Sequence, residues 1–338
     1  MDWKLVGQEW AVYYLKEHVT RNSFRHAYLF AGPQGIGRCT LALRFAQALN
    51  CSEPQAPGEP CGTCRTCVQI ERMQHPDLTI IQADRIGGNI KVDQVRDLQR
   101  SLSLAPYQAP YRIALLLRFE EANPNAANAL LKTLEEPPPK VVLLLTAESA
   151  ESLPPTIVSR CEVLRLRPAA LEIVEKALMD EWNAPPETAR LLSHLSGGRI
   201  GYAIQLYRDP ERLEQRRQWL EDHHRLLSAS RVERFAYAEA LSKDRNILRQ
   251  VIESWQSLWR DVLLRSSATS TPISNLDCRA EIEDLSSLVD IETSYRMLVD
   301  LQRTQGLLDG NVNSRLAVEV FLLNLPRLPA TPILLPTA

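Results

Sequence analysis

The chain has 338 residues, of which 45% are hydrophobic and 24% are charged, and its formal net charge is −2 at pH 7. This length allows two or three domains with separate cores, and the near-neutral charge excludes a protein that binds nucleic acid through an overall positive charge. The first residues lack the apolar core of a signal peptide, and no apolar run reaches membrane-spanning length. We therefore expect a cytoplasmic, multi-domain globular protein without a membrane partner.

The first half of the chain alternates predicted helices with short apolar runs. Helical spacing of apolar residues predicts helices near residues 6–21, 40–49, 92–102 and 125–134. The apolar runs predict buried strands at residues 26–31, 78–81, 112–117, 141–145 and 161–166. Strands that alternate with helices predict an α/β domain with a mostly parallel sheet and helices on both faces.

The pattern changes after Pro168. Residues 169–206 read as short helices with a break at Gly197 and Gly198, and the chain from 209 onward has helical periodicity with an interruption near 266–272. Within this part we expect Trp255 and Trp259 to pack in a core. We expect His223 and His224 to lie on a solvated helix face. The basic residues Arg216, Arg217 and Arg225 are interleaved with glutamates, which also predicts a solvated helix.

A glycine-rich loop follows the first predicted strand. Its sequence, GPQGIGRC, keeps the glycines of the G-x-x-x-x-G-K-[ST] phosphate-binding loop at Gly32, Gly35 and Gly37. Arg38 stands where that motif has lysine, and Cys39 stands where it has the hydroxyl that binds Mg²⁺. A planar guanidinium does not replace a compact ammonium, and a soft thiol does not suit Mg²⁺. The sequence thus predicts the shape of the loop without its catalysis, and leaves open whether nucleotide still binds.

Four of the seven cysteines lie in one short segment, as Cys51-x9-Cys61-x2-Cys64-x2-Cys67. Two C-x2-C steps allow neighbouring thiolates to bind one ion, and four thiolates complete the tetrahedral coordination of a structural Zn²⁺. We therefore predict a zinc knuckle at residues 51–67. Free cysteines at a helix end, or an iron–sulfur cluster, are the alternatives that the spacing leaves open.

The segment Asn128–Pro138 reads NALLKTLEEPP and closely resembles a signature of bacterial clamp-loader subunits. Together with the altered loop, the four cysteines, Val6-Gly7-Gln8, His75-Pro76-Asp77, Ser159-Arg160-Cys161 and Asn311–Leu316, it makes most of the chain resemble the delta-prime family of DNA polymerase III subunits. This resemblance implies an AAA+ fold, with an α/β P-loop domain, a small helical lid and an all-α C-terminal collar. We assign these parts to residues 1–167, 168–207 and 208–328, with a flexible tail at 329–338.

The resemblance also implies a function. Members of this family do not hydrolyse ATP themselves; they act in a ring with gamma/tau-type ATPase subunits and a delta subunit, which loads the sliding clamp onto primed DNA. The family supplies an arginine finger to a neighbouring ATPase, and the matching residue here is Arg160. Judged without the resemblance, Arg160 would be read as an ordinary surface arginine in an ion pair.

Two further positions agree with an inactive ATPase site. Counting back from Asn128 puts Leu117-Arg118 where active relatives carry the Asp-Glu pair of the Walker B strand, with Glu120-Glu121 just beyond. Gly201 occupies the position of the lid arginine, unless a shifted helix start lets Arg199 replace it. Two other functions remain in view: an active ATPase that uses Arg38 and Glu120, and a zinc-knuckle nucleic-acid-binding protein on an inert ATPase scaffold.

Overall fold

The computed structural model describes residues 3–84, 88–309 and 312–328, and the chain divides into two compact units. The first unit contains the residues up to Ala184 together with Gly198–Ile204, and the second contains Pro185–Gly197 together with the residues from Gln205 onward. The lid predicted at residues 168–207 is therefore shared between the two units. The predicted tail, residues 329–338, and Asn311 of the late family motif lie outside the described residues.

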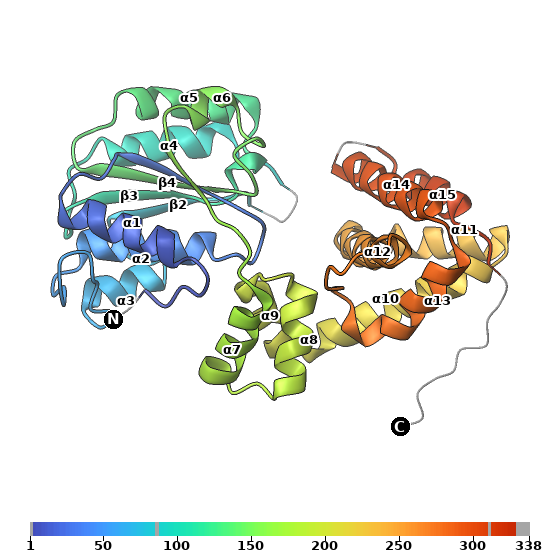
Figure 1. Cartoon of the computed structure of the whole chain (residues 1–338). Helices are drawn as coiled ribbons and strands as arrows, with labels where there is room; N and C mark the ends of the chain where they lie inside the picture. The colour runs from blue at the N-terminus through green and yellow to red at the C-terminus, as the bar shows by residue number, and fades with distance from the viewer. Residues whose placement is uncertain (1–2, 85–87, 310–311, 329–338) are drawn as a thin grey trace. The chain divides into compact units, whose positions relative to one another are not determined.

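The first unit is built on a parallel five-stranded sheet with the strand order β2-β3-β4-β1-β5 (Figure 1). Leu29 of β1, for example, pairs with Leu145 of the central strand β4 on one side and with Val163 of the edge strand β5 on the other. Four of the predicted apolar runs each contain a strand, and the fifth, residues 141–145, forms the first part of the longer strand β4. The strands are β1 (Ala27–Ala31), β2 (Leu78–Ile81), β3 (Arg112–Leu116), β4 (Val141–Ala147) and β5 (Glu162–Arg165).

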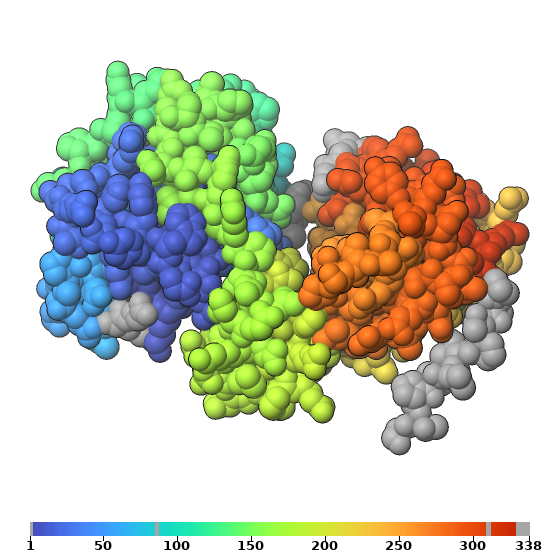
Figure 2. Space-filling model, in the orientation of Figure 1, coloured from blue at the N-terminus to red at the C-terminus, as the bar shows by residue number. Residues whose placement is uncertain are grey.

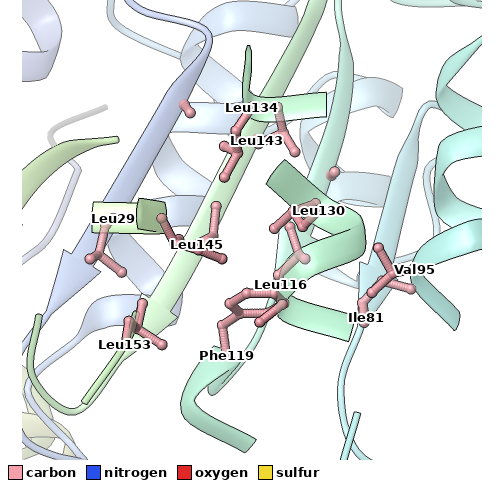
Figure 3. Close-up of a cluster of buried hydrophobic side chains, with 14 of the residues drawn as sticks. Leu29, Ile81, Val95, Leu116, Phe119, Leu130, Leu134, Leu143, Leu145 and Leu153 are labelled. Carbon is pink, nitrogen blue, oxygen red and sulfur yellow. The ribbon is translucent and has the colours of Figure 1, made fainter. Parts of the chain in front are cut away.

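Helices cover both faces of this sheet, which confirms the predicted α/β architecture. On one face lie α1 (Glu9–Thr20), α2 (Arg38–Asn50) and α3 (Arg65–Glu71), and on the other α4 (Val92–Leu102), the 3-10 turn η1 (Phe119–Glu121), α5 (Pro124–Glu135) and α6 (Pro155–Val158) (Figure 1). Because side chains alternate along a strand, Leu143 and Leu145 pack with the α4–α5 side (Figure 3), whereas Leu144 packs with the α1–α2 side.

Three short helices follow the sheet: α7 (Leu171–Trp182), α8 (Pro186–Ser196) and α9 (Ile200–Arg208). The predicted break after α8 is confirmed, because Gly197 and Gly198 both have a left-handed backbone, with φ of 57° and 82°. A Cβ at Gly198 would lie 2.2 Å from the carbonyl oxygen of Ala169, so only glycine fits there.

The second unit is helical from α10 onward. Its elements are α10 (Pro210–Ser228), α11 (Arg231–Leu241), α12 (Arg245–Ser266), η2 (Leu276–Cys278), α13 (Arg279–Leu288), α14 (Ile291–Asp309) and α15 (Ser314–Asn324). Trp255 and Trp259 of α12 are fully buried in its core, as predicted. None of the described helices is long and apolar enough to cross a membrane.

Two polar residues of α10 lie in this core, and their prediction as solvated residues is wrong. His223 is fully buried, and its Nε2 accepts a hydrogen bond of 2.9 Å from the indole N–H of Trp259. Burial lowers the pKa of His223 to about 3, so the ring is neutral and can accept this bond. Arg216 is also buried, and donates to the carboxylate of Asp277 at 2.6 Å.

Like Arg216, Arg234 of α11 is a buried cation, and it bonds the ends of two helices. Its guanidinium donates to carbonyl oxygens at the end of α10 and at the end of α15, those of Leu226, Leu227, Leu322, Leu325 and Pro326. The last carbonyls of a helix have no partner within the helix and carry partial negative charge. They therefore compensate a buried positive charge and tie three helices together.

Candidate functional site

The glycine loop joins β1 to α2, as a phosphate-binding loop does. Gly35 and Gly37 have φ of 80° and 105°, conformations that favour glycine, and Gly37 caps the N-terminus of α2. The carbonyl of Gly37 accepts the first helical hydrogen bond, from the N–H of Leu41 at 2.8 Å. The loop therefore presents a helix N-terminus beyond the carboxyl end of β1, where such folds bind phosphate.

The start of α9 packs directly on this loop. The N–H of Gly201 donates to the carbonyl of Gly35 at 2.8 Å, and a Cβ at Gly35 would lie 2.8 Å from the backbone nitrogen of Tyr202. Gly201 therefore contacts the loop through its backbone, at the position where active relatives would carry a lid arginine according to the family resemblance. Arg199, the proposed substitute, precedes α9 and lies over the ring of Tyr202, 4.6 Å from the ring centroid.

Arg38 is the first residue of α2, and its side chain is only 8% exposed. Its Nη1 lies 4.0 Å from Oε1 of Glu120, and within the described residues this Nη1 has no hydrogen-bond partner. Burial lowers the pKa of Arg38, an effect that the negative charge of Glu120 opposes. Burial likewise raises the pKa of Glu120, and the positive charge of Arg38 opposes that shift. The opposite charges of Arg38 and Glu120 therefore lie beside the loop, and each offsets only part of the cost of burying the other.

The two neighbouring positions also differ from a Mg²⁺ site. Burial raises the pKa of the Cys39 thiol, which keeps it protonated and a poor ligand for Mg²⁺. Arg118, two residues after β3, has a left-handed backbone with φ of 48°. Its N–H donates to Oγ1 of Thr146, and its Nε donates to Oε1 of Glu121 at 2.9 Å. A guanidinium thus occupies the end of β3, where a metal-binding acid would be required.

Arg160 lies in the turn between α6 and β5 and is partly exposed. The segment around residues 150–165, green in Figure 2, reaches the surface of the first unit. Its Nη2 donates to Oε1 of Glu135, the last residue of α5, at 2.6 Å. Its Nη1 donates to the carbonyl of Thr156 at 2.9 Å and to Oγ of Ser159 at 3.3 Å. The side chain remains 35% exposed, so the guanidinium is fixed by its own chain and still accessible.

The four clustered cysteines come together after α2. The Sγ atoms of Cys51, Cys61, Cys64 and Cys67 all lie within 4.8 Å of one another, and Cys51 Sγ lies 3.6 Å from that of Cys61 and 3.9 Å from that of Cys64. Zn–S bonds of about 2.3 Å in a tetrahedron put sulfurs just under about 4 Å apart, so the cluster has the dimensions of a zinc site. These four residues could hold a metal ion.

Backbone N–H groups support the same sulfurs. The N–H of Cys61 donates to Sγ of Cys51 at 3.3 Å, that of Cys64 to Sγ of Cys61 at 3.2 Å, and that of Cys67 to Sγ of Cys64 at 3.4 Å. Burial alone would raise the pKa of Cys64, but hydrogen bonds from Ser52 and Cys67 lower it to about 6. Such donors stabilise thiolates and orient them toward a metal.

The knuckle is also fastened to the rest of the unit. The indole N–H of Trp3 donates to the carbonyl of Gly58 at 3.1 Å, and Nζ of Lys16 lies 3.1 Å from Oε1 of Glu59. On the other side, Nε2 of Gln47 in α2 donates to the carbonyl of Cys67 at 2.8 Å. The cluster therefore joins α1, α2 and the N-terminal segment.

Sequence reasoning missed the two glutamates that meet the arginines. It considered Glu120 only as the acid of an alternative ATPase, because its position in the 3-10 turn cannot be read from periodicity. Glu135 lies in the NALLKTLEEPP segment, and the residue pattern alone does not relate it to Arg160, which it bonds across 25 residues. The family resemblance gives only a weak indication that Glu135 and Arg160 are related, because both lie in segments that resemble the same family.

Comparison with known proteins identifies the family of this chain. The family model described as "DNA polymerase III, delta subunit" matches residues 7–170, and the model described as "DNA polymerase III, delta subunit, C terminal" matches residues 210–327. DNA polymerase III subunit delta′ of Pseudomonas aeruginosa is 34% identical over 319 residues, which cover 91% of this chain and 94% of that protein. The chain belongs to the delta-prime family of DNA polymerase III subunits.

Other relatives match this chain over only part of its length. The delta′ subunit of Bacillus subtilis is 35% identical over 202 residues, 60% of each chain. Subunit tau of Escherichia coli is 34% identical over 207 residues, which cover 60% of this delta-prime family member but only 32% of tau. Among solved structures, a gamma subunit-related protein of Thermotoga maritima has a TM-score of 0.47 and 18% identity, covering 94% of this chain and 99% of its own.

Proposed function

We propose that this chain is a clamp-loader subunit that does not hydrolyse ATP itself and supplies Arg160 to a neighbouring ATPase. Its partners are then gamma/tau-type ATPase subunits and a delta subunit, and through this complex it acts on the sliding clamp and primed DNA in the cytoplasm. Its membership of the delta-prime family supports the clamp-loader role. The contrast between the buried Arg38 and the partly exposed Arg160 supports an inactive site in this chain and an arginine that acts on a neighbour.

The ion pair of Arg38 with Glu120 is the observation that carries the first half of the proposal. In a working site, an acid near the loop binds Mg²⁺, and the cation bridges the phosphates. Here Glu120 faces the guanidinium of Arg38 at 4.0 Å, and the neighbouring Cys39 and Arg118 cannot supply oxygen ligands. The residues present do not fit Mg²⁺, so the altered loop is degenerate in function as well as in sequence.

Accessibility supports the second half. An arginine finger acting from a neighbouring subunit neutralises charge on a transferring phosphoryl group, and is worth about 10³–10⁵ in rate in GTPases. Such a residue has to reach another molecule while keeping a defined geometry. Arg160 meets both requirements, since it is partly exposed and bonded to Glu135 and Thr156.

The four cysteines are proposed to bind a structural Zn²⁺. Their sulfur separations suit tetrahedral coordination, and four thiolates leave no open position for a substrate or a water molecule. The ion would hold together a proline- and glycine-rich segment that has little core of its own. We also retain, as proposals, a helical lid at residues 168–207 and an oligomerisation collar at residues 208–328.

Whether the altered loop is inactive can be tested by measuring ATP turnover by the isolated chain in the presence of Mg²⁺. We expect no turnover above the buffer background, and none after the double substitution Arg38→Lys with Cys39→Thr, because Arg118 still occupies the end of β3. An active gamma/tau-type subunit serves as the positive control. Turnover by the native chain would instead favour the second candidate, a divergent ATPase that uses Arg38 and Glu120.

A further inference from the structure

Glu135 and Arg160 form an ion pair between two elements that are each well fixed. Glu135 ends α5, a helix that begins with Pro124 and is capped by the side chain of Asn123, which accepts from the N–H of Ala126 at 2.8 Å. Near the other end of α5, Leu134 is buried. The carboxylate of Glu135 therefore projects from an anchored helix end.

The turn that carries Arg160 is fixed in the same way. Ile157 of α6 is fully buried, and its carbonyl accepts the N–H of Arg160 at 3.1 Å. The backbone of Arg160 is thus held by α6, while its side chain is held by Thr156, Ser159 and Glu135. Three acceptors on two elements determine where the guanidinium lies.

We propose that Glu135 is a positioning residue for Arg160, an inference that rests on the proposed function. A guanidinium has five N–H groups in a fixed plane, and three hydrogen bonds to its own chain leave others for a phosphoryl oxygen. A long side chain that is already ordered loses less conformational entropy when it docks on a neighbour. Glu135 thereby keeps the finger in a productive orientation before the neighbour binds ATP.

The size of the effect follows from the exposure of the pair. The two side chains are 35% and 51% exposed, so solvent screens their attraction. Exposed ion pairs at the upper end of the measured range correspond to about fivefold in an equilibrium or a rate. We therefore expect Glu135→Ala to lower the partner's ATP turnover about fivefold, far less than loss of Arg160 itself.

The experiment is a double-mutant cycle in the assembled complex with clamp and primed DNA. ATP turnover is measured with the native chain, Glu135→Ala, Arg160→Ala and the double variant, and subunit assembly is checked for each. Glu136→Ala, which removes the adjacent exposed glutamate, is the matched control. We expect kcat to fall about fivefold in Glu135→Ala, with the KM for ATP unchanged, and no further fall when Arg160 is already absent.

Four outcomes would overturn this inference. Full turnover in Glu135→Ala, with a large loss in Arg160→Ala, would refute the positioning role while leaving the proposed function intact. An equal loss from Glu135→Ala in both arginine backgrounds, or an equal loss in the Glu136→Ala control, would indicate a merely structural effect. No loss in Arg160→Ala would refute the proposed function itself, and the inference with it.

Discussion

Arg38 and Arg160 belong to the same α/β unit, and each faces a glutamate, yet their surroundings differ in every respect that matters for chemistry. Arg38 is 8% exposed and lies 4.0 Å from Glu120, with an Nη1 that lacks a hydrogen-bond acceptor among the described residues. Arg160 is 35% exposed and donates to Glu135 at 2.6 Å. The first arginine has been withdrawn from solvent, whereas the second is accessible and well ordered.

This difference indicates what each charge can do. A buried charge with an imperfect partner carries a desolvation cost and is not available to another molecule. An exposed charge fixed by its own chain contributes little to stability, but it can act on a neighbour with a small loss of entropy. The same residue type is therefore buried beside the altered loop at Arg38, whereas at Arg160, in the turn before β5, it is the residue that we propose acts on a neighbouring subunit.

Removal of the proposed Zn²⁺ should have the largest structural effect. Structural Zn²⁺ binding in small sites is worth about 10–16 kcal/mol at neutral pH, and residues 51–67 have little core without it. We expect chelation, or Cys64→Ser, to raise hydrogen exchange in residues 51–67 more than about 100-fold, while the turn at residues 155–161 keeps its protection. Cys278→Ser is the control, since Cys278 lies in the second unit. Equal exchange with and without chelator would contradict the metal proposal.

Arg38→Met should have the next largest effect and should depend on pH. Burial already raises the pKa of Glu120, and removing Arg38 takes away the charge that opposes this shift. A carboxyl whose pKa is higher in the folded than in the unfolded chain binds more protons when folded, so stability falls as pH rises between the two values. We expect a destabilisation of about 1–2 kcal/mol at pH 8 and less at pH 5, measured from exchange of β1 and β4 amides.

A second substitution provides the control for this pH dependence. Adding Glu120→Gln to Arg38→Met removes the uncompensated carboxylate, so the double variant should recover much of the stability and lose its dependence on pH. If Arg38→Met caused the same destabilisation at pH 8 and at pH 5, Arg38 and Glu120 would not be coupled. The description of Arg38 as a buried cation that compensates Glu120 would then be wrong.

Arg160→Ala should have the smallest effect on stability. Both partners of its ion pair are substantially exposed, and such pairs contribute about 0–1 kcal/mol. We expect the free energy of unfolding of the α/β unit to change by less than about 0.5 kcal/mol. A loss as large as that of Arg38→Met would mean that Arg160 holds the fold together, and any effect of the variant on turnover would then need another explanation.

The fold was largely predictable because its signals are local. Each strand of the sheet overlaps one of the predicted apolar runs, and the helices α2, α4 and α5 begin and end within two residues of their predicted bounds. The cysteine spacing likewise predicted the cluster, since it concerns a few neighbouring residues. His223 was mispredicted because polar neighbours along α10 suggested solvent, whereas the tertiary contact with Trp259 buries it.

The pairings in the candidate site could not be predicted in the same way. Glu120 approaches Arg38 from a 3-10 turn 82 positions later in the chain, and Gly201 contacts Gly35 from a different helix. Such contacts depend on the packing of distant elements, which periodicity does not encode. The family resemblance identified Arg160, but only the structure relates it to Glu135.

The most direct test of the account is the ATP turnover of the complete clamp-loader complex, with clamp and primed DNA, carrying either the native chain or Arg160→Ala. Arg165→Ala is the matched control, because Arg165 is also exposed and pairs with Glu151 at 2.7 Å. We predict at least about a tenfold loss of turnover in Arg160→Ala with intact assembly, and no loss in the control. Unchanged turnover in Arg160→Ala would contradict the proposal that this chain activates its neighbour.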